Sequence, residues 1–137
     1  MKRKFEMIGI MLVFGIIGIS CDNGTTGLTG GTTGGTSASK TVTIKYQLSG
    51  TITEVDYIMY RNSSGGYDSL NNVTPPWEKS FSVIIDKGGY FSASIAGSSY
   101  TSGSLTAKIF VNGTEIKSVN SSGDTYFTVT AVEIIRN

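Results

Sequence analysis

The clearest pattern in the chain is the alternation of apolar and polar residues in TVTIKYQLS, residues 41–49. Its apolar members lie on one side of an extended chain, which predicts a β-strand with one buried face. No segment after residue 20 has the apolar period of a helix. Six further segments rich in β-forming residues follow, separated by turn residues: 53–61, 77–86, 90–97, 104–111, 114–119 and 125–135.

Short strands in this number, with turn signals between them, predict an all-β domain over residues 41–136. We expect an Ig-like antiparallel β-sandwich of about seven strands. Asn112-Gly113 is the strongest hairpin signal, because both central residues of a type I′ turn need a positive φ. Residues 62–76, NSSGGYDSLNNVTPP, are predicted to form a loop. The residues predicted to face inward are Val42, Ile44, Tyr46, Leu48, Phe81, Val83, Ile85, Phe91, Ala93, Ile95, Leu105, Ala107, Ile109 and Val111.

The N-terminus has the pattern of a secretory signal peptide, predicted for residues 1–20. Three basic residues in MKRKFE precede a 13-residue run of apolar residues and glycine, residues 7–19, and then Ser20 and Cys21. Such a run is short for a bilayer-spanning helix. Gly18-Ile19-Ser20-Cys21 resembles the lipobox of bacterial lipoproteins, although Gly18 stands where that motif usually has Leu. The resemblance implies cleavage before Cys21 and acylation of its sulfur with diacylglycerol and of its amino group with a fatty acid such as palmitate. The alternative is an uncleaved signal anchor with an inert thiol.

Residues 21–40 are predicted to form a tether between the acylated Cys21 and the domain. The segment after the cysteine is rich in Gly and Thr and has one large apolar side chain, Leu28. Such a sequence cannot bury enough apolar surface to offset its ordering entropy. Treated as a flexible coil, it spans about 25 Å.

Composition argues against catalysis and against nucleic-acid binding. The chain has one cysteine and no histidine, so it lacks the residues for a disulfide, a Cys-rich metal site or a His-based catalytic triad. Residues 21–137 hold eight basic and nine acidic residues, which is no basic field for nucleic acid. Glu54 and Asp56 share a strand face, but two such carboxylates are far more often solvated surface than an acid–base pair. We therefore expect no catalytic residue, no metal and no cofactor.

Three aromatic residues are candidates for contact with a partner: Trp77, Tyr67 and Tyr100. Trp77 is the sole tryptophan and follows Pro75-Pro76, which fix an extended entry into the next strand. It could close one end of the sandwich or anchor a partner, since tryptophan is enriched in interface hot spots. Tyr67 and Tyr100 fall in predicted loops, where their rings could stack on sugars or pack at the rim of the core with wet hydroxyls.

Several segments together resemble the MmpS family of transport accessory proteins: VTIKYQLSG, PPWEKSFSV, GSLTAKIFVNGTEI and SSGDTYFTV. The resemblance implies an extracytoplasmic β-sandwich that works beside RND-type (MmpL-like) transporters in lipid or siderophore export. The chain departs from that family in having a lipobox in place of an N-terminal membrane helix, and in lacking a cysteine pair within the domain.

Two functions remain open from the sequence. The first is a lipid-anchored, non-catalytic accessory to an RND-type transporter, held on a membrane of the bacterial envelope through Cys21. The second is a surface or periplasmic adhesion or glycan-binding module on the same anchor.

Overall fold

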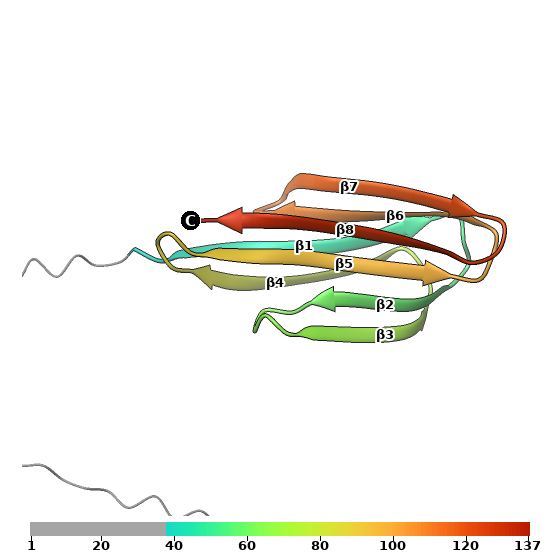
Figure 1. Ribbon diagram of the computed structural model, residues 1–137, viewed down its shortest axis with the longest axis horizontal. Helices are drawn as coiled ribbons and strands as arrows, with labels where there is room; N and C mark the ends of the chain where they lie inside the picture. The colour runs from blue at the N-terminus through green and yellow to red at the C-terminus, as the bar shows by residue number, and fades with distance from the viewer. Residues whose placement is uncertain (1–37) are drawn as a thin grey trace, which may run out of the picture. The chain divides into compact units, whose positions relative to one another are not determined.

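The computed structural model describes residues 38–137, which form eight β-strands (Figure 1). The predicted signal peptide, Cys21 and most of the predicted tether lie outside the described residues. No helix long and apolar enough to cross a bilayer occurs in residues 38–137. The strands are β1 (Lys40–Gly50), β2 (Val55–Arg61), β3 (Tyr67–Val73), β4 (Trp77–Ile85), β5 (Tyr90–Ser99), β6 (Gly103–Val111), β7 (Thr114–Gly123) and β8 (Phe127–Arg136).

The strands make two four-stranded sheets that pack face to face. The first sheet has the order β4-β1-β6-β7, and the second has the order β3-β2-β5-β8. Every pairing is antiparallel, and the chain crosses repeatedly from one sheet to the other. The predicted all-β class and the antiparallel β-sandwich are confirmed.

The core lies between the sheets and is built from alternate residues of the strands. In β1, the residues Val42, Ile44, Tyr46 and Leu48 are all fully buried. The inward faces predicted for β4, β5 and β6 are also correct, with Phe81, Phe91 and Val111 half-buried at the margins. This agreement follows from the two-residue period of a strand, which places every second side chain on the same face.

The prediction of a loop over residues 62–76 is wrong in its middle, where β3 forms. β3 pairs with β2 at the edge of the second sheet, with Tyr67 opposite Arg61 and Val73 opposite Val55. All its residues except Val73 are exposed, so neither of its faces carries an apolar stripe. An edge strand that the opposite sheet does not cover has no reason to alternate, and the sequence of β3 therefore lacks the alternation that predicts β1, β4, β5 and β6.

The two ends of the sandwich differ in what they carry (Figure 1). At one end, which we call the proximal end, the chain enters β1 at Lys40, and the turn 86–89 lies beside the C-terminus, where the Asn137 amide donates to the Gly89 carbonyl. The turn 112–113 lies nearby, next to Thr43 of β1. Asn137 ties this end together, because its side-chain amide donates to the carbonyls of Ala38 (3.1 Å) and Ile85 (2.8 Å). The opposite, distal end carries the connections 51–54, 100–102 and 124–126.

The predicted hairpin at Asn112-Gly113 is confirmed by its backbone. Both residues have positive φ, 50° and 83°, as a type I′ turn requires. The Asn112 side chain fixes the turn to β1, since its Oδ1 accepts a hydrogen bond from the Thr43 amide at 2.9 Å. Beyond the turn the β6–β7 register shifts next to Phe110, so the turn and a bulge set the register together.

Gly113→Val should lower the free energy of unfolding by about 1–3 kcal/mol, the usual strain of a non-glycine residue held at such a φ. A Cβ at Gly113 would meet no atom within 4 Å, so the loss would come from the backbone conformation and not from a clash. Gly113→Asn is the matched control, because asparagine tolerates this region. Guanidinium denaturation of both variants measures the difference, and equal midpoints for valine and asparagine would contradict the assignment of strain.

Candidate functional site

The structure separates the three aromatic residues proposed for partner contact. Trp77 begins β4 and is half-buried against the core. Tyr67 begins β3 and is exposed. Tyr100 lies in the connection between β5 and β6 at the distal end and is also exposed. Residues 38–137 contain no pocket, so the candidate sites among them are surface features.

Trp77 is the outer member of a chain of aromatic rings that runs into the core. Its ring lies 5.3 Å from that of Tyr60, and Tyr60 lies 5.9 Å from Tyr46. Tyr46 in turn meets Phe81 edge-on at 5.6 Å. Such tilted and edge-on pairs stabilise packing beyond the area that they bury. Trp77, at the start of β4, therefore packs against Tyr60 of β2 in the opposite sheet.

The hydroxyl of Tyr46 joins the two sheets. It donates a hydrogen bond to the Arg61 carbonyl at 3.0 Å and accepts one from the Ser94 amide at 3.1 Å. The ladder between β2 and β5 ends at the pair Tyr60–Ile95, and Arg61 and Ser94 would form the next pair. The phenol from β1 thus takes the place of a direct backbone hydrogen bond, and it satisfies both polar groups there.

Burial dominates the electrostatics of this phenol. Loss of water raises the pKa of Tyr46 to about 12, although the Ser94 hydrogen bond and the nearby Arg61 act in the opposite direction. Burial also raises the pKa of Tyr60, with the Asp68 carboxylate adding to the rise. Both hydroxyls are therefore neutral, and that of Tyr46 acts as a structural hydrogen-bonding group.

Tyr67 contacts a guanidinium on the same side of the sandwich. The Arg61 guanidinium carbon lies 5.8 Å from the Tyr67 ring and 5.9 Å from the Phe91 ring. Its Nε is buried without a hydrogen-bond partner, and within residues 38–137 Arg61 forms no ion pair. Aromatic faces attract such a cation. The Tyr67 ring thus contacts the Arg61 guanidinium at the edge of the second sheet.

Tyr100 pairs with a second exposed tyrosine that we did not propose as a site residue, Tyr126. The two ring centroids are 4.8 Å apart with 39° between the ring planes. Tyr100 is 69 % exposed and Tyr126 is 55 % exposed, so most of the pair faces solvent. They meet because β5 pairs with β8, with Ser99 opposite Phe127, which places the residue after β5 beside the residue before β8.

Hydrogen bonds fix the loop that carries Tyr100. The hydroxyl of the buried Ser99 donates to the Glu54 carbonyl at 3.2 Å and accepts from the Thr101 amide at 3.1 Å. The Tyr100 amide donates to Oδ2 of Asp56 at 2.8 Å. Asp56, weighed above as half of an acid–base pair, thus positions this loop. The backbone on both sides of Tyr100 is held, so its exposed ring projects from a rigid support.

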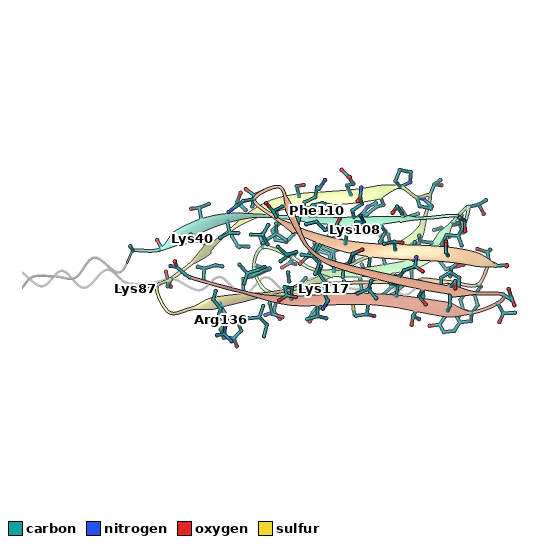
Figure 2. All side chains as sticks on the ribbon, turned by 90° about the horizontal axis from the view of Figure 1, so that it is seen from above. Lys40, Lys87, Lys108, Phe110, Lys117 and Arg136 are labelled. Carbon is teal, nitrogen blue, oxygen red and sulfur yellow. The ribbon has the colours of Figure 1, made fainter. Side chains whose placement is uncertain are left out.

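The two ends of the sandwich differ in the charged residues that they carry. Figure 2 shows Lys40, Lys87 and Arg136 around the proximal end, while Lys108, Phe110 and Lys117 lie along the sheets. The distal connections 51–54, 100–102 and 124–126 contain two acidic residues, Glu54 and Asp124, and no lysine or arginine. No group of three or more metal-ligating side chains occurs in the described part of the chain. The distal end is therefore acidic, rich in hydroxyls, and topped by an aromatic pair.

Comparison with models of known protein families finds no match for this chain, and a search of curated proteins finds no significant match either.

Proposed function

We propose that this protein is a lipid-anchored, non-catalytic binding module of the bacterial cell envelope. Acyl chains on Cys21 hold it on a membrane, and the β-sandwich presents its distal end to a ligand beyond that membrane. Two acyl chains are needed for this role, because one chain alone binds a bilayer only reversibly.

The observation that supports this proposal most strongly is the placement of the exposed tyrosine pair. The chain enters the domain at Lys40, at the proximal end, and Tyr100 and Tyr126 lie at the other end of the strands. A ten-residue strand such as β5 spans about 33 Å, so the domain itself carries the pair well away from the point of entry. Exposed aromatic rings on a rigid support are typical of recognition surfaces.

The role beside an RND-type transporter, which the resemblance to the MmpS family implies, stays a prediction. The described contacts identify no protein partner. The geometry favours the second function that the sequence leaves open, the adhesion or glycan-binding module, because an exposed aromatic pair at the tip suits it directly.

Cys21→Ala should abolish fatty-acid labelling of the protein and leave the first 20 residues attached. The variant lacks the thiol that accepts the acyl group, and cleavage follows acylation of that thiol. Growth with a clickable fatty acid, followed by purification and mass measurement of the N-terminus, tests this. Ser20→Ala is the matched control, since it keeps a small residue before the cysteine and should be labelled and cleaved. Label retained in Cys21→Ala would exclude the proposed anchor.

A further inference from the structure

We propose that Tyr100 and Tyr126 form a stacking platform for a neutral saccharide. This inference rests on the proposed function as a binding module and names its ligand class. The shape of the site is the first argument. Two tyrosine rings in contact at 4.8 Å hold one another in place, yet each keeps more than half of its surface exposed. The two ring planes are tilted by 39°, so the C–H groups on the apolar face of a pyranose would stack on the exposed face of one ring and contact the edge of the other.

The rigidity of the support is the second argument. An exposed aromatic residue on a mobile loop loses freedom when it binds a ligand, whereas the Asp56 and Ser99 hydrogen bonds already hold the backbone of Tyr100 and Thr101, and the Tyr126 ring packs against that of Tyr100. Tyr126 precedes β8 directly, and its neighbour Phe127 is buried in the core. Both rings are thus pre-organised, one from each of two neighbouring connections.

The charge and polarity around the rings select the ligand class. Hydroxyls and carboxylates adjoin the platform: Thr101, Ser102, Asp124 and Thr125 lie next to the two tyrosines in the chain, and the Asp56 carboxylate accepts from the Tyr100 amide. No cation occurs in the three distal connections. These groups can accept and donate hydrogen bonds to sugar hydroxyls. An acidic saccharide or a phosphate would meet like charge without a compensating lysine or arginine, which excludes these ligands from the assignment.

Binding of neutral oligosaccharides by the full-length protein tests the platform. The protein is purified in a detergent without a sugar headgroup and titrated by calorimetry with cellohexaose, laminarihexaose and chitohexaose, and with an oligogalacturonate of equal length as the acidic probe. We expect saturable binding of at least one neutral hexaose and at least tenfold weaker binding of the acidic one. The ligand could be a free oligosaccharide or a glycan chain on a cell surface. Retention of the protein, or of wild-type cells that carry it, on insoluble glucan would identify the second of these sources.

Matched variants assign the binding to the platform. Tyr100→Ala and Tyr126→Ala should each weaken binding at least tenfold, whereas Tyr126→Phe, which keeps the ring, should bind within twofold of the parent. Tyr90→Ala is the positional control, because Tyr90 is 66 % exposed but lies at the proximal end. Circular dichroism confirms that each variant is folded.

Three results would overturn the assignment: no binding of any neutral hexaose, tighter binding of the acidic probe, or equal losses in Tyr90→Ala and Tyr126→Ala. A photo-crosslinking residue at position 126 that captures a protein in intact cells, without any saccharide binding, would also overturn it and leave the broader binding function standing. The proposed lipid anchor is tested separately, by fatty-acid labelling of Cys21. The proposals of a lipid anchor and of a saccharide platform can therefore fail independently.

Discussion

Tyr46→Ala should lower the free energy of unfolding by about 3–5 kcal/mol, as expected for removing a large aromatic side chain from a core. Tyr46 is fully buried and contacts the rings of both Tyr60 and Phe81. Tyr46→Phe keeps these ring contacts and removes only the hydroxyl that joins Arg61 to Ser94. Because two backbone groups then lose their partner, we expect a loss of about 1–3 kcal/mol. Guanidinium denaturation of residues 38–137 measures both losses, and a Tyr46→Phe variant as stable as the parent would show that the bridge contributes nothing.

Alkaline pH gives a second measurement of the same hydroxyl. The pKa of Tyr46 is raised to about 12 in the fold, above its ordinary value near 10, because burial disfavours the phenolate. The unfolded chain therefore loses this proton first, and the contribution of the neutral hydroxyl is complete below pH 10 and is lost as the pH rises through 12. The stability difference between the parent and Tyr46→Phe should shrink over that interval. Tyr60 is present in both proteins, so its own titration cancels in the comparison.

The strands that bury an apolar face could be predicted from the sequence, as could β7 from the Asn112-Gly113 turn before it, whereas β3 could not. β1 alternates because Val42, Ile44, Tyr46 and Leu48 all enter the core. β3 is an edge strand that β4 does not cover, and its residues YDSLNNV read as a polar loop. β3 forms because its backbone pairs with β2. Such backbone hydrogen bonds require no particular side-chain polarity, so the sequence pattern does not reveal them.

Long-range pairing also decided which site residues could be predicted. Tyr100 stands out in the sequence as an aromatic residue in a turn-rich segment, but its neighbour Tyr126 lies 26 positions later. Only the pairing of β5 with β8 brings them together, and that order does not follow from strand count or turn length. The double role of Tyr46, in the core and in the ladder between β2 and β5, was hidden for the same reason. The alternation of β1 predicts that Tyr46 points inward, but not which carbonyl and amide its hydroxyl meets.

Gly50→Ala should lower the free energy of unfolding by about 3 kcal/mol, at the upper end of what over-packing usually costs. Gly50 ends β1 opposite Leu105 of β6, and a Cβ there would be driven into the carbonyl of Ser104 and to within 3.0 Å of the Leu105 Cα. These are backbone atoms of a central strand, so no side-chain rotation can relieve the clash. The two strands would have to separate where β1 leaves the first sheet.

That separation would break the hydrogen bonds that follow Gly50. The Thr51 amide donates to the Ser104 carbonyl at 3.0 Å, and the Ser104 amide donates to the Thr51 hydroxyl at 2.9 Å. Gly66→Ala is the control, because its Cβ would meet only Asn62 and Ser64 side-chain atoms at 3.5 Å or more, and it should stay within about 0.5 kcal/mol of the parent. Amide hydrogen exchange locates the damage, and faster exchange should begin at Thr51 and Ser104. If Gly50→Ala and Gly66→Ala unfold at the same denaturant concentration, β1 and β6 do not approach as closely at this point as described.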